Sequence, residues 1–207
     1  MALVSDAYVS KKENSMITQE EELILQSYIT VSLLAELGNN KFFESTYFRE
    51  MNFGSPDCKS FLERNGIDNQ GSAIMSLYAM LVVPYELIRE KFPNEFSSMN
   101  DFLKSKTTII NTTYHSNSSD SDLMYHLRNA VAHCRISFKE GESINFTDSN
   151  RNRTKEFSGK LPLSDLSMFI HKLQIVIQMK VIKEIQSRLG TQIGDVAKLV
   201  NLTSDRE

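Results

Sequence analysis

The sequence is poor in the residues that break helices or crosslink chains. Its 207 residues include eight glycines, four prolines, two cysteines and no tryptophan. Cys58 and Cys134 are too few for a disulfide framework or a zinc site, so we expect both to serve as small apolar filler. The scarcity of glycine and proline, together with many Leu, Ile, Met and Glu residues, favours helix over sheet.

Strong charge and long apolar runs are also missing. The formal net charge is −3, so any contact with nucleic acid has to come from a local basic patch. Residues 1–15 lack the apolar stretch of a signal peptide. The longest apolar run, residues 79–85, contains Pro84 and is too short to span a bilayer. We therefore expect a cytoplasmic protein without membrane contact.

Several catalytic motifs are absent as well. The sequence has no phosphate-binding glycine-rich loop, no His-Glu-x-x-His, no cysteine pairs and no Gly-x-Ser-x-Gly. These absences exclude ATPases, zinc peptidases and hydrolases with a nucleophile elbow. We expect neither a bound metal nor a cofactor.

Periodicity divides the chain into a polar start and one helical domain. Residues 1–17 are polar and aperiodic, which predicts a flexible tail, and residues 18–207 form the predicted domain. The stretch Thr18–Glu21 is a capping box, and Gly38-Asn39-Asn40 ends the helix that it starts.

The middle of the sequence predicts the centre of a bundle. Residues 70–91 are apolar nearly all round, which is typical of a central helix, and Pro84 should kink or split it. We expect residues 107–118 to form a connection without regular structure. Shorter helices are predicted over residues 41–51, 56–64, 99–105 and 193–202.

Alternating apolar and polar residues then indicate a small antiparallel β-ribbon, at about residues 135–161. Its predicted strands cover residues 135–139, 143–147 and 155–160. A long helix with an apolar stripe follows at about residues 164–189. The predicted fold is therefore mainly α, a helical bundle with the β-ribbon inserted before the long C-terminal helix.

The stretch best suited to chemistry lies in a predicted helix at about residues 119–135. On a helical wheel its buried stripe consists of Leu123, Leu127, Ala130 and Cys134. One flank carries Asp122, His126, Asn129 and His133, and the other carries Arg128 and Arg135. Because Arg128 and His133 lie roughly 140° apart, one helix does not aim both at one point. A second copy related by a two-fold axis brings both pairs into one cleft, so we predict a homodimer.

The helix sequence Leu-Arg-Asn-x-x-Ala-His, followed by a β-ribbon and a long helix, resembles the HEPN superfamily. The resemblance is carried mainly by residues 119–189. It implies that Arg128 and His133 form a metal-independent ribonuclease site, with Asn129 as the polar residue that often follows the arginine. RNA and a second protomer are the implied partners. The resemblance also implies a role of the toxin–antitoxin or antiviral defence type, with an antitoxin or regulatory protein as a further partner.

The implied reaction is attack by an RNA 2′-hydroxyl on its neighbouring phosphate. His133 would accept the proton of that hydroxyl or donate one to the leaving 5′-oxygen. Arg128 would hold the phosphate and stabilise the charge of the transition state. Asn129 would orient the imidazole or bind phosphate. The product would carry a 2′,3′-cyclic phosphate.

Other side chains near this helix are candidates for binding RNA. His126 is a candidate second acid–base or phosphate-binding group, although a helical histidine is more often a bystander. Tyr125 is a candidate for stacking on a base, with interface packing as the alternative. Arg151 and Arg153 in the second hairpin loop form a basic rim with Arg135, unless the loop is simply solvated.

Two other interpretations of the motif helix remain open. The arginine and histidine can belong to a non-catalytic dimeric module that binds RNA or a partner protein. Alternatively, a ribonuclease activity can be latent and released by a partner or a modification. A nuclease requires His133 for turnover, whereas a binding module can keep its affinity without it.

Overall fold

The computed structural model describes residues 17–67, 69–114, 122–139 and 142–190. The expected tail, apart from its last residue, and the expected helix at 193–202 lie outside these described residues.

The predicted mainly helical fold is confirmed, beginning with a long first helix, α2 (Gln19–Asn39). Its capping box is formed as expected: Thr18 Oγ1 accepts from the Glu21 N–H, and the Glu21 carboxylate accepts from the Thr18 N–H. A smaller group of helical segments follows α2: η1 (Phe42–Glu44), α3 (Thr46–Glu50) and α4 (Pro56–Asn65). Cys58 on α4 is exposed, so its expected role as apolar filler is wrong.

The central helix runs from Gln70 to Ile88 and contains a π-helical segment. Its parts are α5 (Gln70–Leu77), η2 (Tyr78–Val82) and α6 (Val83–Ile88). The wider π turn lies just before Pro84, where a proline ring would clash with an ordinary α-helical turn. Among the described residues, this helix has the length and composition of a membrane span, as core helices of bundles also do. Here it packs against α2, α8 (Leu123–Ala132) and α9 (Leu163–Val176).

The antiparallel sheet has four strands and not the three expected. The strands are β1 (Thr108–Thr112), β2 (Ile136–Lys139), β3 (Ser143–Ser149) and β4 (Glu156–Pro162), in the spatial order β1-β4-β3-β2. Residues 108–112, expected to be part of a connection, pair with β4 instead. The β-branched residues of this segment suit a strand, but their pairing partner lies more than 40 residues away in the sequence.

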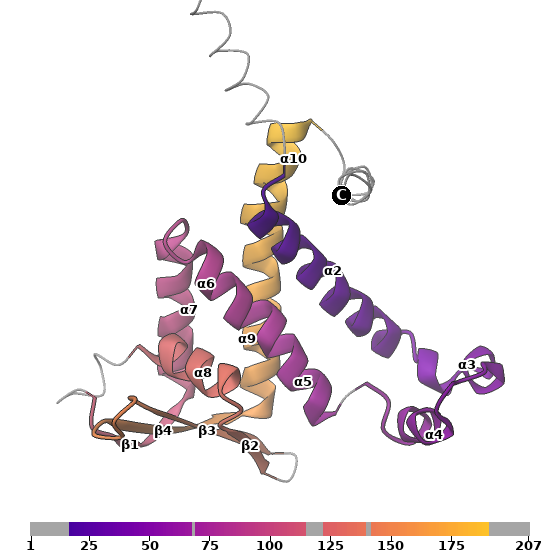
Figure 1. The fold of residues 1–207 in the computed structure, drawn as a ribbon, viewed down its shortest axis with the longest axis horizontal. Helices are drawn as coiled ribbons and strands as arrows, with labels where there is room; N and C mark the ends of the chain where they lie inside the picture. Colours follow the sequence, from indigo (N-terminus) through magenta and orange to yellow (C-terminus); the bar gives the residue numbers. More distant parts are fainter. Residues whose placement is uncertain (1–16, 68, 115–121, 140–141, 191–207) are drawn as a thin grey trace, which may run out of the picture.

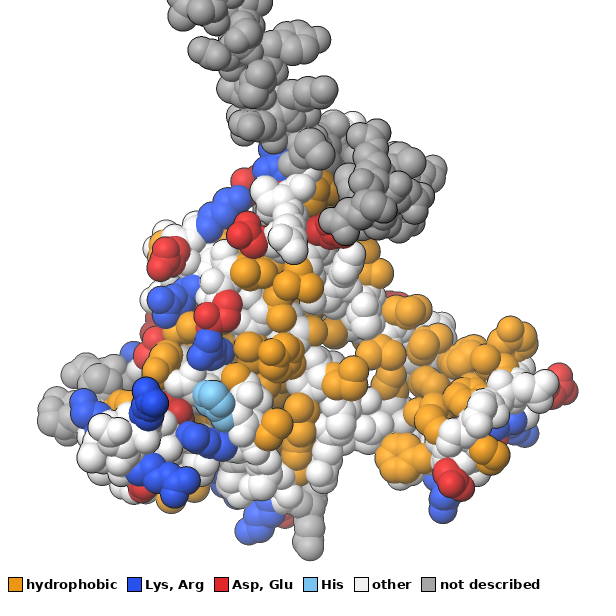
Figure 2. Space-filling view, viewed as in Figure 1, with side chains coloured by type: hydrophobic (Ala, Val, Ile, Leu, Met, Phe, Trp, Pro, Cys, Tyr) orange, Lys and Arg blue, Asp and Glu red, His pale blue; other side chains and the backbone are white. Residues whose placement is uncertain are grey.

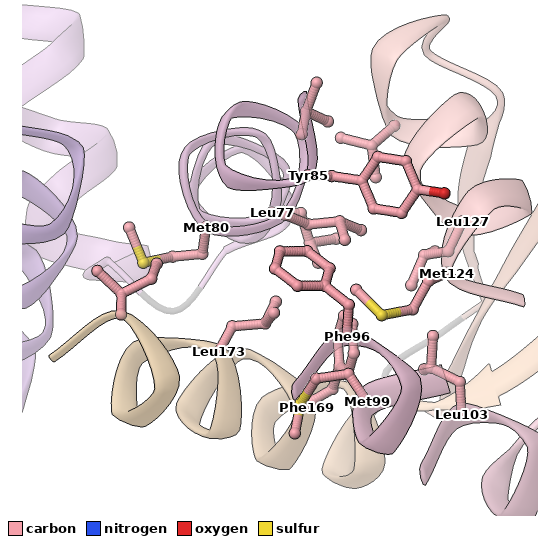
Figure 3. Close-up of a cluster of buried hydrophobic side chains, with 14 of the residues drawn as sticks. Leu77, Met80, Tyr85, Phe96, Met99, Leu103, Met124, Leu127, Phe169 and Leu173 are labelled. Carbon is pink, nitrogen blue, oxygen red and sulfur yellow. The ribbon is translucent and has the colours of Figure 1, made fainter. Parts of the chain in front are cut away.

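Two further helices complete the bundle, which stands over one face of the sheet (Figure 1). They are α7 (Pro93–Lys106) and the long C-terminal helix made of α9 (Leu163–Val176), η4 (Ile177–Ile182) and α10 (Lys183–Leu189). The core lies where the central helix, α7, α8 and α9 meet, as Figure 3 shows. Leu77, Phe96, Met124 and Phe169 reach it from these four helices and are all buried.

Candidate functional site

The motif helix, α8 (Leu123–Ala132), is shorter than the helix predicted over residues 119–135. Residues 119–121 lie outside the described residues. The helix begins at its N-cap Asp122, whose carboxylate accepts from the backbone N–H of Tyr125 at 3.0 Å. The side-chain oxygen of Asn100 on α7 accepts hydrogen bonds from the first two N–H groups of the helix. Asn100 and the N-cap residue Asp122 therefore both cap α8.

A turn without glycine ends α8 and sets the position of His133. The N–H of Arg135 donates to the carbonyl of Ala130 at 2.7 Å, and the N–H of Cys134 donates to that of Val131 at 3.1 Å. These two bonds form a Schellman motif, which requires a left-handed residue and usually has glycine there. Cys134 takes that conformation, with φ 53°, and its side chain is exposed and not buried filler. His133 therefore stands at the C-cap of α8, with its side chain exposed.

A buried carboxylate from the sheet organises the flank of α8 that carries His126 and Asn129. Asp148 on β3 is 4% exposed, and its Oδ2 lies 2.8 Å from Nδ1 of His126. The same oxygen accepts a hydrogen bond from Nδ2 of Asn129 at 3.1 Å. The two residues share a flank as predicted, but that flank faces β3 and not solvent.

His126 is therefore part of the interface between α8 and the sheet. Its side chain is 1% exposed, and its ring stacks on Phe157 with centroids 4.3 Å apart. The ring of Tyr114 meets it edge-on at 4.6 Å. This burial corrects the expected substrate-binding role of His126, because a ring enclosed in this way does not reach RNA.

The charge of Asp148 is stabilised by its neighbours. Burial by itself raises the pKa of the carboxyl, but the hydrogen bonds from His126 and Asn129 outweigh burial and hold the pKa below its ordinary value. A charged Asp148 is the stronger acceptor for both donors. It therefore fixes the orientation of the Asn129 amide.

Asn129 in turn orients the guanidinium group of Arg128. Its Oδ1 accepts a hydrogen bond from Nη1 of Arg128 at 2.6 Å, while its Nδ2 is bound by Asp148. Asn129 is itself buried, and its amide contacts Arg128 and Asp148 and not His133. In this arrangement it positions Arg128, and its predicted catalytic role stays a prediction.

The central helix holds the other side of Arg128. Glu86 on α6 forms an ion pair with its Nη2, and the ring of Tyr85 lies 5.9 Å below the guanidinium carbon. The guanidinium carbon of Arg89 also lies over the Tyr85 ring, 4.7 Å from the ring centroid, and Nη1 of Arg89 donates a hydrogen bond to the Tyr85 hydroxyl. Burial, followed by the charge of Asp122, raises the pKa of Tyr85, so its hydroxyl stays protonated.

The remaining predicted residues lie around this braced arginine on the surface. Basic side chains gather around a histidine over α8 and the neighbouring sheet (Figure 2). His133, Tyr125, Arg135, Arg151 and Arg153 are all exposed. Within the described part of the chain, no hydrogen bond or ion pair joins Arg128 to His133. Arg128 instead turns toward α6.

Sequence reasoning missed the residues that brace the site, although two patterns could have revealed them. Asp148 follows the buried Ile144 and Phe146 at two-residue spacing, so strand alternation places its carboxylate on the buried face. Glu86 is the one charged residue between Gln70 and Ile88, and it follows Tyr85 just after the proline of that helix.

The described residues offer little to a metal ion. None of their groups combines three or more His, Cys, Asp or Glu side chains in a suitable arrangement. The i, i+4 pair of Asp122 and His126 is divided, because His126 turns its Nδ1 to Asp148.

Comparison with known proteins gives one family. A family model described as HEPN pEK499 p136 matches residues 11–184. The match spans the central helix, α8, the whole sheet and most of the long C-terminal helix. No curated protein and no solved structure matches the chain.

Proposed function

The chain belongs to the HEPN pEK499 p136 family, and on that premise we propose that it is a metal-independent endoribonuclease. The observation that carries the proposal is that Asn129 and Glu86 brace Arg128 on α8, while the exposed His133 stands at the end of the same helix. A fixed cation and a free imidazole are the two groups that RNA cleavage by its own 2′-hydroxyl requires.

In the proposed reaction, the 2′-oxygen of RNA attacks the adjacent phosphorus as His133 removes its proton. The bond from phosphorus to the 5′-oxygen breaks, and that oxygen takes a proton from a second imidazole. Arg128 neutralises the charge that builds on the phosphate oxygens between these steps. The products are a 2′,3′-cyclic phosphate and a 5′-hydroxyl.

The proposed site is shared by two protomers. Arg128 turns toward α6, whereas His133 stands at the end of α8, so one chain does not direct both at one phosphate. A two-fold axis beside α8 supplies the missing geometry and the second imidazole. Light scattering at micromolar concentration tests this: a dimer is expected, and a monomer contradicts the shared cleft.

The deciding experiment is cleavage of a labelled single-stranded RNA in excess EDTA. We expect wild type to leave a 2′,3′-cyclic phosphate, and His133→Ala and Arg128→Ala each to be slower by about 10²-fold or more. His171→Ala, which removes an exposed histidine on α9, is the matched control and should cleave like wild type.

If folded wild type cuts none of the RNAs tested, or if His133→Ala cuts equally well, the nuclease proposal fails. Retained RNA or protein binding by His133→Ala would then favour the non-catalytic dimeric module. A role in toxin–antitoxin or antiviral defence, in the cytoplasm and under an antitoxin or regulatory partner, extends the same proposal. It is tested by the growth of cells that express wild type or His133→Ala.

A further inference from the structure

The outer face of the sheet carries a polar row that crosses β1, β4 and β3 and ends at Arg135, just before β2. Thr147 on β3 pairs with Ser158 on β4, which pairs with Asn111 on β1. On the other side, the N–H of Thr147 donates to the carbonyl of Arg135, just before β2. Since successive strand residues face opposite sides and Phe157 is buried against α8, this row points away from the bundle.

A hollow of about 380 Å³ opens over this row. The β3–β4 hairpin adds Ser149, Arg153 and Glu156 to its walls. The hollow therefore presents two guanidinium groups, one amide, three hydroxyls and the carboxylate of Glu156, and Asp148 and Phe157 also line it. Arg151, in the same hairpin, does not line it, so the subsite proposed below leaves Arg151 out of the basic rim expected from the sequence.

We propose that this hollow binds one nucleotide of a single-stranded RNA, with a phosphate held by Arg135 and Arg153. A guanidinium group binds phosphate through two parallel N–H···O hydrogen bonds. The volume of the hollow falls within the range of small-ligand pockets. The amide and hydroxyls of the row hydrogen-bond to the sugar and the edge of the base. This inference rests on the proposed function, because it assigns a binding subsite to the same substrate.

The hollow is linked to the motif helix in two ways. Arg135 lies two residues after His133, so the hollow begins where α8 ends. Nη1 of Arg135 donates to Ser149 Oγ at 3.0 Å and lies 3.9 Å from Oδ1 of Asp148. The other oxygen of that carboxylate holds Asn129. One carboxylate therefore joins the hollow to the residue that braces the catalytic arginine.

Asp148 does not repel an incoming phosphate as a free carboxylate would. Its charge is shared among His126, Asn129 and Arg135. Glu156 is the exposed acid of the hollow, and it can accept a hydrogen bond from a base amino group.

The test measures binding separately from cleavage. Its probe is a fluorescein-labelled RNA octamer with 2′-fluoro riboses, which lacks the 2′-hydroxyl nucleophile. Fluorescence anisotropy in EDTA gives Kd for wild type, Arg135→Gln, Arg153→Gln and Thr147→Val. Arg151→Gln is the matched control, because it removes the same charge from the same hairpin outside the hollow.

We expect Arg135→Gln and Arg153→Gln each to weaken binding about five- to tenfold, with a salt slope smaller by about 0.7 per lost phosphate contact. Arg151→Gln should stay within about twofold of wild type. Thr147→Val, which keeps shape and strand propensity, should weaken binding about threefold. Thermal unfolding establishes that each variant is folded.

Equal losses from Arg151→Gln and Arg153→Gln would overturn the subsite in favour of a diffuse basic surface. Unchanged affinity in every hollow variant, or no binding by wild type, would overturn it as well. Cleavage of unmodified RNA of the same sequence is scored in parallel. Binding that depends on the hollow, without cleavage, would support the subsite and contradict the nuclease. Cleavage without such binding would support the nuclease and contradict the subsite.

Discussion

The amide nitrogen of Asn129 lies 3.1 Å from a carboxylate oxygen of Asp148, a residue 19 positions further along the chain. Asn129 sits beside Arg128, the proposed catalytic arginine, and Asp148 lies on the strand beneath the helix. Through this bond the sheet sets the orientation of Arg128, whose Nη1 donates to the other end of the same amide. Several measurable consequences depend on it.

Removing the carboxylate should destabilise the fold. Asp148→Ala leaves the buried His126 and Asn129 without their acceptor, and we expect a loss of about 3 kcal/mol in the free energy of unfolding at neutral pH. Urea unfolding followed by circular dichroism measures it. Asp165→Ala, which removes a less buried aspartate on α9, is the control, and an equal loss there would contradict a special role for Asp148.

The same carboxylate should make stability depend on acid. The folded state holds the pKa of Asp148 below its ordinary value, so the unfolded chain binds more protons as the pH falls. This stabilisation is fully present above the ordinary aspartate pKa of about 4 and is lost as the pH drops through the lower folded value. Urea titrations between about pH 6 and about pH 3 should therefore show a steeper decline for wild type than for Asp148→Asn. Parallel declines would contradict the prediction.

Asn129→Ala should lower kcat more than it changes KM. Arg128 would lose the acceptor that fixes its guanidinium, and the transition state needs that fixed charge more than the bound substrate does. We expect kcat for RNA cleavage to fall about tenfold. Asn94→Ala, which changes an exposed asparagine on α7, serves as the control. A rise in KM alone would show that Asn129 does not act through transition-state charge.

Glu86→Gln should increase the affinity for RNA. The carboxylate of Glu86 neutralises Arg128 through their ion pair, and a phosphate has to compete with it. We expect Kd for the uncleavable RNA to fall about threefold, while an exposed pair of this kind changes stability by less than about 1 kcal/mol. Glu90→Gln, four residues further on and beyond the end of α6, is the control and should leave Kd unchanged. Weaker binding by Glu86→Gln would contradict this prediction and show that the bracing of Arg128 by Glu86 outweighs its competition with the phosphate.

Gly159→Ala should destabilise the sheet. A Cβ at this position would lie 3.0 Å from the ring of Phe146 and 3.1 Å from that of Phe157, both of which are buried. We expect a loss of about 1–3 kcal/mol from this overpacking, measured as a lower Tm. Gly54→Ala, where a Cβ would meet nothing within 4 Å, should leave Tm nearly unchanged. Equal Tm values for the two variants would contradict this account of the packing.

Local patterns in the sequence determined most of the helices. The capping box at Thr18, the helix that begins at Pro56 and the apolar central helix are all formed. Each depends on residues within a few positions of one another, so their chemistry can be read along the chain. The same reasoning placed Arg128 and His133 on the motif helix and predicted them as its catalytic residues, which stays a prediction.

Tertiary structure alone decided where the groups of the site point. The end of α8 depends on the left-handed conformation of Cys134, and the sequence has no glycine there to indicate it. The pairing of His126 with Asp148 joins residues 22 positions apart, and that of Arg128 with Glu86 joins residues 42 apart. Such contacts form only when the whole bundle has met the entropic cost of closing the chain between them, so no short stretch of sequence specifies them. The sequence thus determined which side chains the motif helix carries, and the packing of β3 and α6 against that helix decided that Arg128 is braced.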